Sequence, residues 1–340
     1  MFLFQPKRAF FEEEALEYPL GAAILAKMTA TDIPVKIIGS HNRVTGIPGG
    51  NPQQCYHEAK QTLVVGVKKD LHLNTCKPSA DFEFAIGTSC PGGCQYCYLQ
   101  THLGNKPYIR VYVNLAEILE SVKKITEKNA PGITTFEAAS TSDPLAVEHL
   151  TGSLAKTIEF FAGLKSAFLR VVTKFTAVEP LLMLNHQGRT RFRFSLNTAE
   201  IIRKFEPNTA TLAERISAAQ KMVQANYPLG FIIAPLFIYP RFEVSYTELF
   251  RKLSMELDPV PPDLTFEFIT HRFTKRAKNI ILERFPNTQL DLDETTRRRK
   301  FGKYGLIKFI YPEPEYQQLK KFILENIHLF FPRARVEYFT

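Results

Sequence analysis

The chain is organised around one short stretch, Cys90-Pro91-Gly92-Gly93-Cys94-Gln95-Tyr96-Cys97-Tyr98, which holds three of its five cysteines. These three follow the spacing C-x3-C-x2-C. Three thiolates on one loop can hold three corners of a [4Fe–4S] cluster and leave the fourth iron without a protein ligand. The glycines let the backbone turn tightly enough for the sulfurs to converge. The alternative is a zinc site, but zinc needs a fourth ligand and usually takes C-x2-C pairs, and Cys55 and Cys76 are not paired with this loop.

Length and composition describe an ordinary soluble protein. The 340 residues are 45% hydrophobic and 23% charged, which is enough to bury a large core. No apolar run is long enough to span a membrane, and the amino terminus lacks the layout of a signal peptide. An odd number of cysteines, three of them in one loop, argues for a reducing cytoplasm rather than disulfides.

The positive charge is concentrated near the carboxyl end. From Arg272 to Lys308 the sequence holds 11 Lys or Arg residues and 4 Asp or Glu residues, within a chain whose net charge is +9. A concentrated basic stretch indicates a polyanion as partner, nucleic acid first. The alternative is a solvated face with no partner.

From about residue 80, short β-rich runs alternate with helical patterns. The runs that predict strands are Phe82–Gly87, Thr134–Ala138, Phe168–Val172, Arg191–Leu196, Gly230–Ala234 and Leu264–Ile269. The patterns that predict helices are Leu115–Asn129, Leu145–Gly163, Thr211–Asn226, Tyr246–Leu257 and Lys275–Arg284. This alternation predicts a parallel sheet with right-handed crossovers. Six units suit an α/β partial barrel of the (β/α)6 type, with a doubly wound sheet as the alternative.

Polar residues gather where these strands end, and in such barrels the chemistry lies at that rim. Any one of them could be a cap or turn residue, but together they predict a site. Strand by strand, the rim residues are the cysteine loop, Ser140-Thr141-Ser142-Asp143, Thr173-Lys174, Ser195 with Asn197, Ala234-Pro235, and Thr270-His271-Arg272.

Segments on both sides flank the predicted barrel. Residues 1–75 form an N-terminal extension with a helical pattern over Glu12–Met28 and two short strands, Val35–Ile38 and Thr62–Val67. Residues 76–285 form the barrel. Residues 286–340 contain a basic hairpin over Phe301–Tyr311, then a helix, Tyr316–Leu329, and a last strand, Ala334–Phe339.

The cysteine spacing is that of radical S-adenosylmethionine (SAM) enzymes, and further motifs narrow the resemblance. Along almost its whole length the chain resembles the spore photoproduct lyase family. Each matching stretch is short, but their order and spacing together are specific. They are Ser40-His41-Asn42, Lys77-Pro78-Ser79-Ala80, Cys97-Tyr98-Leu99-Gln100, residues 106–114, Phe136-Glu137-Ala138-Ala139, Thr141-Ser142-Asp143, residues 191–195, residues 271–275 and the ending Glu337-Tyr338-Phe339-Thr340.

This resemblance implies a DNA-repair lyase that reverses the thymine–thymine spore photoproduct through a 5′-deoxyadenosyl radical. It implies a [4Fe–4S] cluster held by Cys90, Cys94 and Cys97, with SAM on its open iron. The residues implied to bind SAM are Tyr96, Tyr98, Ser142, Lys174, Ser195, Asn197 and Ala234. Tyr96 and Tyr98 would also relay the radical. The implied partners are DNA that carries the lesion and an electron donor such as flavodoxin or ferredoxin, in the interior of a spore or germinating cell.

The basic segment would then bind DNA phosphates, and the hairpin would support a lesion turned out of the duplex. The residues expected to contact DNA are His271, Arg272, Arg298, Lys300, Lys303, Tyr304 and Lys308.

The sequence departs from the family at one catalytic position. The cysteine that donates hydrogen in the family falls at position 140, where this chain has Ser140, and an O–H bond is too strong to quench a thymine radical. Three explanations stay open: a replacement that traps the enzyme, donation by Cys76 instead, or a homologue with altered output. For Cys76 the plainer interpretation is an inert buried thiol.

Two other function classes also remain. One is a radical SAM enzyme that acts on another nucleic acid or on a small molecule. The other is a redox or binding protein whose cluster performs no SAM chemistry. Release of 5′-deoxyadenosine separates the second class from the enzymes.

Overall fold

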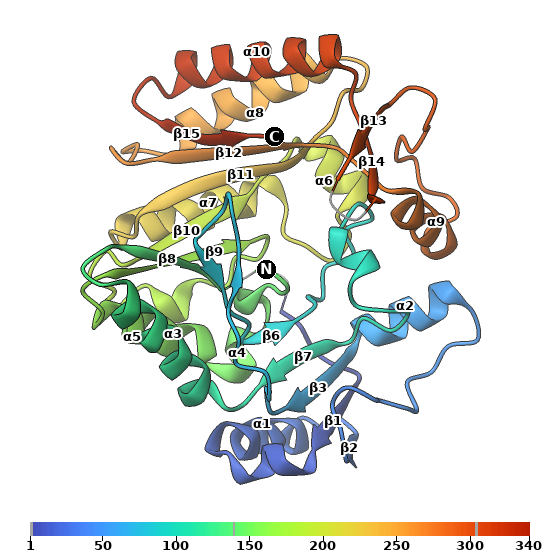
Figure 1. The fold of residues 1–340 in the computed structure, drawn as a ribbon, viewed down its shortest axis with the longest axis vertical. Coiled ribbons are helices and arrows are strands. Elements are labelled where there is room, and N and C mark those ends of the chain that lie inside the picture. The colour runs from blue at the N-terminus through green and yellow to red at the C-terminus, as the bar shows by residue number, and fades with distance from the viewer. Residues whose placement is uncertain (1–2, 139, 303–304) are drawn as a thin grey trace. The chain divides into compact units, whose positions relative to one another are not determined.

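A computed structural model describes residues 3–138, 140–302 and 305–340, and the chain divides into two units (Figure 1). Unit 1 runs up to Gly92 and continues from Leu103 to Phe192, and unit 2 comprises Gly93–His102 and Arg193–Thr340. The division passes through the cysteine loop, and the three segments expected from the sequence stay a prediction. Lys303 and Tyr304, two of the expected DNA contacts, lie outside the described residues. None of the helices in the described part is long and apolar enough to cross a bilayer.

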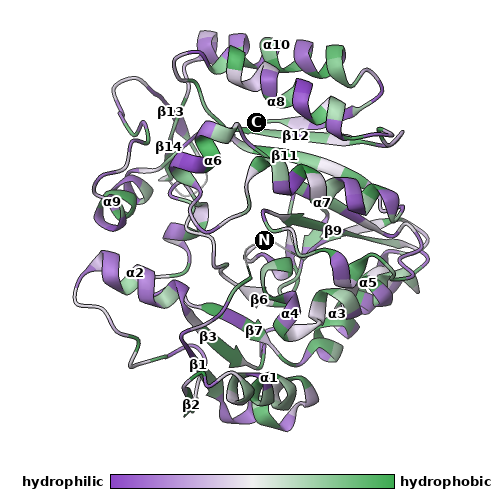
Figure 2. Cartoon of the chain, turned by 180° about the vertical axis from the view of Figure 1, so that it is seen from behind, coloured by the Kyte–Doolittle hydropathy of each residue, from purple (hydrophilic) through white to green (hydrophobic). Residues whose placement is uncertain are grey.

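The first sheet of unit 1 has the strand order β2-β1-β3-β7-β6. The bounds are β1 Arg8–Glu12, β2 Val35–Ile38, β3 Thr62–Gly66, β6 Gly87–Thr88 and β7 Ile109–Tyr112. All neighbours are parallel except β6 and β7. β3 is buried along its whole length, and Figure 2 colours it as hydrophobic. Such a central parallel strand is an uninterrupted apolar run because both of its faces are covered.

Within unit 1, the second sheet of the chain has the order β9-β8-β5-β4. Its strands are β4 Asn74–Thr75, β5 Phe82–Glu83, β8 Thr134–Glu137 and β9 Ala167–Thr173. The helices of unit 1 are α1 Pro19–Ala30, α2 Pro52–Lys60, α3 Leu115–Asn129, α4 Glu148–Thr151 and α5 Ser153–Ala162. α3 and α5 lie side by side (Figure 1). The helix expected over Leu145–Gly163 is instead divided into a 3-10 turn, α4 and α5. Gly152, with a left-handed φ of 61°, separates α4 from α5.

Unit 2 is built on the strand order β15-β12-β11-β10. These strands are β10 Thr190–Ser195, in which the division between the units falls, β11 Leu229–Leu236, β12 Thr265–Thr270 and β15 Arg335–Phe339. The helices are α6 Ala199–Phe205, α7 Leu212–Gln224, α8 Phe242–Glu256, α9 Lys275–Arg284 and α10 Glu313–Phe330. α8 and α10 lie side by side (Figure 1), and an antiparallel hairpin is formed by β13 Arg298–Phe301 and β14 Ile307–Ile310.

Local sequence signals explain where the helices begin. Thr211 caps α7 in a capping box with Glu214. Thr274 accepts a hydrogen bond from the backbone of Ala277 at the start of α9, and Asn51 caps α2 just before Pro52. Pro314 stands in the first turn of α10 and not before it, since a first-turn proline loses no helical hydrogen bond.

Candidate active site

The second half of the cysteine loop belongs to unit 2 and is fixed through its backbone. Gly93 N donates to Pro207 O at 2.8 Å, and Gln95 N donates to Phe205 O at 2.9 Å. A Cβ at Gly93 would lie 3.1 Å from Pro207 Cγ, so glycine suits this close approach. Cys94 is buried, and Cys97 is half-buried at the start of the 3-10 turn Tyr98–Thr101. These backbone hydrogen bonds fix the second half of the loop to the end of α6 and the segment that follows it.

The first half of the loop belongs to unit 1. Cys90 is half-buried, and its carbonyl oxygen accepts a hydrogen bond from Lys60 Nζ at 2.7 Å. None of the five cysteines is in a disulfide. In the described part of the chain no three His, Cys, Asp or Glu side chains form a ready-made metal site. The ligand roles of Cys90, Cys94 and Cys97 therefore stay a prediction from their spacing.

Tyr96 is tied to a buried ion pair within unit 2. Its hydroxyl donates to the Glu206 carboxylate, and Glu206 Oε2 lies 2.6 Å from Arg215. Arg215 in turn donates to Ser195 O at 2.8 Å. Burial, followed by the charge of Glu206, raises the pKa of Tyr96 well above its usual value. One chain of contacts thus leads from the tyrosine of the cysteine loop to the end of β10.

The remaining tyrosine and the other predicted SAM contacts of unit 2 differ in exposure. Tyr98 is 60% exposed and its ring lies 6.0 Å from that of His102. Asn197 is fully buried, and its amide donates to Pro235 O at 2.8 Å and accepts from Tyr246 Oη at 3.2 Å. The bond to Pro235 holds the last residues of β11, the strand that contains Ala234. Asn197 therefore helps to fix the backbone beside Ala234 at the carboxyl end of β11.

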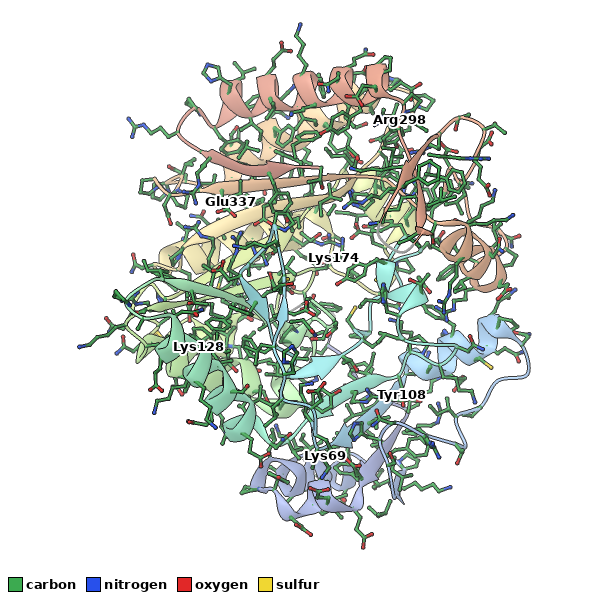
Figure 3. The ribbon with its side chains drawn as sticks, in the orientation of Figure 1. Lys69, Tyr108, Lys128, Lys174, Arg298 and Glu337 are labelled. Carbon is green, nitrogen blue, oxygen red and sulfur yellow. The ribbon has the colours of Figure 1, made fainter. Side chains whose placement is uncertain are left out.

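In unit 1, Asp143 joins the ends of β8 and β9. Its carboxylate accepts from Thr173 Oγ1 at 2.8 Å and from Lys174 N at 2.9 Å. Burial raises the pKa of Asp143 to about 6, although the two hydrogen bonds act to lower it. Ser142 Oγ is buried and has no hydrogen-bond partner among the described residues. Ser142 and Lys174 are thus brought to one rim, with a hydroxyl available for a ligand (Figure 3 labels Lys174).

The two candidate hydrogen donors also belong to unit 1. Ser140 follows β8 and is half-buried. Cys76 is half-buried in a turn in which its carbonyl oxygen accepts from Ala80 N at 3.0 Å. A thiol in this state is neither sequestered in the core nor bonded to a second sulfur.

The basic segment is less exposed than its charge count indicates. Arg284 is buried and donates to Gln100, and Arg297 is buried against the Tyr311 ring and Asp291. His271 is 2% exposed, and burial, followed by the charge of Arg297, lowers its pKa to about 3. A neutral interior imidazole cannot offer a positive charge to phosphate. The expected DNA role of His271 therefore has no electrostatic basis.

The exposed cations lie on and beside the hairpin. Arg298, labelled in Figure 3, pairs with Glu313 at 3.0 Å, which offsets part of its charge. Lys300 lies directly opposite Lys308, and burial, Arg272 and Lys300 lower the pKa of Lys308. Two cations face to face destabilise a hairpin unless an anion lies between or beside them. Arg272, Lys300 and Lys308 are thus the best candidates for phosphate contacts.

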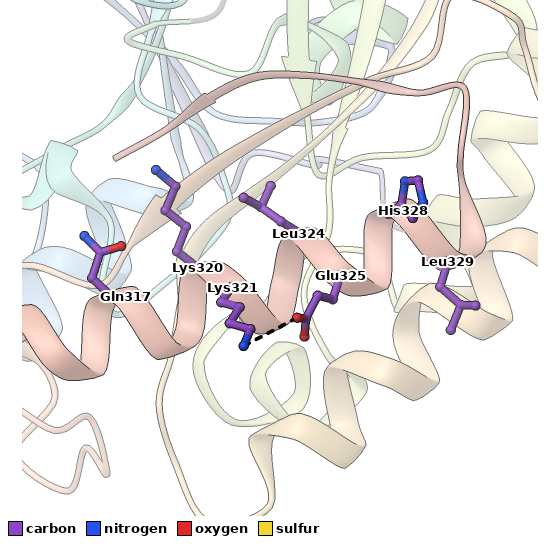
Figure 4. Close-up of a pocket in the computed structure, with 7 residues that line it drawn as sticks. All are labelled: Gln317, Lys320, Lys321, Leu324, Glu325, His328 and Leu329. Carbon is purple, nitrogen blue, oxygen red and sulfur yellow. Dashed lines mark ion pairs between the residues drawn. The ribbon is translucent and has the colours of Figure 1, made fainter.

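A shallow surface pocket lies elsewhere, on the outer face of α10. Figure 4 shows its lining, which contains none of the predicted site residues: Gln317, Lys320, Lys321, Leu324, Glu325, His328 and Leu329. Its mixed charges and open form give no basis for catalysis.

Sequence reasoning missed several residues that support the site. Arg215 lies on the apolar face of α7 among buried residues such as Leu212 and Ile216, and an arginine in that stripe is a signal for a buried ion pair. Glu206 carries no comparable signal because it directly follows α6 and belongs to no periodic pattern. Lys60 was missed because α2 has a weak apolar pattern.

Taken together, the fold and the rim define an α/β protein with a three-cysteine loop, polar groups at strand ends and a basic hairpin. A protein-family model described as "Spore photoproduct lyase" matches residues 4–340. The chain therefore belongs to the spore photoproduct lyase family. It is 48% identical to the spore photoproduct lyase of Geobacillus sp. (strain Y412MC61) over 338 residues, 99% of each chain.

Solved structures agree with this relationship. A spore photoproduct lyase complexed with dinucleoside spore photoproduct has a TM-score of 0.97 and 48% identity, and 99% of each chain is covered. A double variant of spore photoproduct lyase, with bound AdoMet and dinucleoside spore photoproduct, matches equally well, with a TM-score of 0.97, 48% identity and 99% of each chain covered. That variant has cysteine changed to alanine at its position 140 and serine changed to cysteine at its position 76. The predicted fold class, an α/β partial barrel, is confirmed by these matches.

Proposed function

We propose that this chain is a DNA-repair lyase that returns the spore photoproduct to two thymines, with SAM and a [4Fe–4S] cluster as cofactors. The observation that carries the proposal is the full-length match, at 48% identity, to enzymes whose structures hold AdoMet and the dinucleoside lesion. An external one-electron donor such as a flavodoxin or ferredoxin would reduce the cluster. The DNA of a spore or germinating cell would be the substrate.

The residues present fit both cofactors. Three thiols in one short loop are the donor set that a [4Fe–4S] cluster takes, and Cys90, Cys94 and Cys97 would hold it. The partnerless hydroxyl of Ser142 suits a polar group of SAM. When bound, the reduced cluster and SAM supply the 5′-deoxyadenosyl radical that takes hydrogen from C6 of the lesion.

The chain's own residues would bind and orient SAM. The Lys174 ammonium would pair with the carboxylate of SAM, while Asp143 holds the Lys174 backbone. Ser195 is held at the end of β10 by Arg215. Ala234 directly precedes Pro235, which Asn197 holds near the end of β11, and the backbone of Ala234 would face the adenine. Tyr96 and Tyr98 would pass the radical back toward SAM.

The final hydrogen atom would come from Cys76. After the methylene bridge breaks, one thymine needs a hydrogen atom, and a thiol S–H bond is weak enough to give it, whereas the O–H bond of Ser140 is not. The double variant described above pairs a new cysteine at its position 76 with loss of the cysteine at its position 140. This chain has Cys76 and Ser140, the same division of thiol and non-thiol.

The decisive experiment uses the reconstituted, reduced protein and a dinucleoside spore photoproduct deuterated at C6. Intact thymidine dinucleoside should form, and deuterium should appear in SAM or 5′-deoxyadenosine. A Cys94→Ala variant is the control and should form neither. Release of unlabelled 5′-deoxyadenosine beside an intact lesion would favour another nucleic-acid or small-molecule substrate. No 5′-deoxyadenosine at all would favour a cluster without SAM chemistry.

A further inference from the structure

Ser89, which directly precedes the first cysteine of the loop, has an unusual backbone conformation. Its φ is 67°, in the left-handed region that serine rarely adopts, and it is 2% exposed. A non-glycine residue is strained in this region and persists there only where its surroundings hold it. The contacts that hold Ser89 in this conformation therefore also fix the backbone next to Cys90, a proposed metal ligand.

Two segments of unit 1 hold Ser89. Its hydroxyl donates to Pro107 O at 2.8 Å, just before β7, and its backbone N–H donates to Thr141 O at 2.7 Å, just after β8. Ser89 also forms a parallel bridge with Ser142, a predicted SAM contact. The start of the cysteine loop is thus tied to the rim of the second sheet.

A third contact adds a charge. Lys60, the last residue of α2, donates from Nζ to Cys90 O at 2.7 Å and lies 3.4 Å from Ser89 Oγ. α2 is itself fixed to β1, because Arg8 pairs with Glu58 at 2.6 Å. The lysine therefore reaches the loop from an anchored helix. Its ammonium is held beside the main chain of the first proposed cluster ligand.

A fixed positive charge at this place has a definite consequence. Reduction adds one electron to the cluster, so a nearby cation stabilises the reduced form more than the oxidised form. Net charge and hydrogen bonds around the ligands are the protein's means of setting the potential of such a cluster. The plainer interpretation is that Lys60 only fastens the loop, and the two roles can be separated by experiment.

We propose that Lys60 is a positioning residue of the cluster loop, which holds the Cys90 backbone together with Ser89 and raises the reduction potential of the cluster. The proposal rests on the proposed function, because it requires the cluster at Cys90, Cys94 and Cys97. The step concerned is the uptake of one electron from an external low-potential reductant. Through Lys60, the N-terminal segment would then influence how readily the cluster is reduced.

The test compares three replacements in the full reconstituted chain. Lys60→Met removes the charge and the donor, Lys60→Gln keeps a donor without charge, and Lys60→Arg keeps both. Iron and sulfide per chain report loop integrity, and a redox titration followed by electron paramagnetic resonance reports the potential. Lys128→Met, at an exposed position on α3 (Figure 3), is the matched control for loss of one charge.

At a fixed ambient potential, we expect Lys60→Met and Lys60→Gln to lower the ratio of reduced to oxidised cluster about tenfold, or about 59 mV for one electron. Lys60→Arg should restore the wild-type ratio and Lys128→Met should not change it. Unchanged potentials in all variants with full iron content would overturn the proposal, as would a potential restored by Gln. If the wild-type chain assembles no cluster, the proposed function itself fails.

Discussion

The phenol of Tyr96 donates its hydrogen bond to a carboxylate, Glu206, which is itself paired with the buried guanidinium of Arg215. The two charged side chains are wholly shielded from solvent. A tyrosine between two proposed cluster ligands is therefore oriented by a charge pair more than a hundred residues away in the sequence. This arrangement gives Tyr96 a fixed position and makes the pair a test of the site's construction.

Glu206→Ala should destabilise the protein by about 3–5 kcal/mol, because it leaves the Arg215 charge buried without its partner. Urea unfolding measures this loss. The matched control is Glu200→Ala, which removes a pair with Lys204 that has a 2.7 Å separation but is 38% exposed on both sides. That change should cost about 0.2–1 kcal/mol. Equal losses of unfolding free energy in the two variants would contradict the conclusion that Glu206 and Arg215 form a buried ion pair.

The sequence predicted the regular parts of the barrel well. α3 and α9 have the predicted bounds, and β8 to β12 lie within two residues of the predicted strands. α3 has a regular apolar face and α9 begins at the Thr274 cap, so in both helices the local signals agree with the tertiary packing. The sequence did not predict β1. Its short apolar run leads directly into the helical pattern that begins at Glu12, and that pattern dominated the prediction for this segment. β7 was read only as a family motif, although it pairs with β3 in the first sheet.

The candidate site was predictable where chemistry requires a spacing or a strand end. The three cysteines, Ser142, Asp143 and Lys174 were predicted in this way, and their roles stay predictions. Glu206 and Lys60 act through contacts that are distant in sequence, which no local pattern encodes. Burial also changed the interpretation of charge. Arg284 and Arg297 were counted in the basic segment and His271 was expected to contact DNA, but all three are buried.

Cys76→Ala should abolish clean repair if Cys76 gives the final hydrogen atom. The lesion would still be opened, so by-products should replace thymine while 5′-deoxyadenosine chemistry continues. Chromatography of the products from the dinucleoside lesion measures the ratio. Adding Ser140→Cys to Cys76→Ala should restore thymine, because it places a thiol at the family's usual donor position. Cys55→Ala is the control, and a full thymine yield from Cys76→Ala would exclude Cys76 as donor.

Asp143 should make the stability of the protein fall as the pH rises from about 4 to about 6. Burial raises its folded pKa to about 6 from the ordinary 3.8. The folded chain therefore binds the proton more tightly than the unfolded chain, and this contribution is full below pH 4 and lost through pH 6. Because a tenfold change in proton affinity is worth about 1.4 kcal/mol, this difference in pKa corresponds to a loss of stability on the order of 3 kcal/mol.

Unfolding curves of the wild type and of Asp143→Asn, measured across this range, isolate the effect. Glu148, whose pKa burial raises to about 7, contributes a slope of the same sign to both proteins. The difference between the two curves should therefore decline only between pH 4 and 6. Parallel curves would mean that Asp143 titrates normally in the folded protein.

The facing pair of Lys300 and Lys308 yields a prediction in which two measurements move in opposite directions. Lys300→Ala removes like-charge repulsion across the hairpin, so it should leave stability unchanged or raise it by about 0.2–1 kcal/mol. If Lys300 neutralises a phosphate, the same change should weaken DNA binding. The plot of log affinity against log salt concentration should then become shallower, with the magnitude of its slope smaller by about 0.9.

Lys321→Ala on α10 is the matched control, because Lys321 is 77% exposed and lies outside the hairpin. It should alter neither stability nor the salt slope. Fluorescence anisotropy with a labelled duplex at several salt concentrations gives the slope, and urea unfolding gives the stability. An unchanged slope in Lys300→Ala would assign the facing cations to a solvated surface. A loss of both stability and affinity would mean that Lys300 supports the hairpin and reaches DNA only through it.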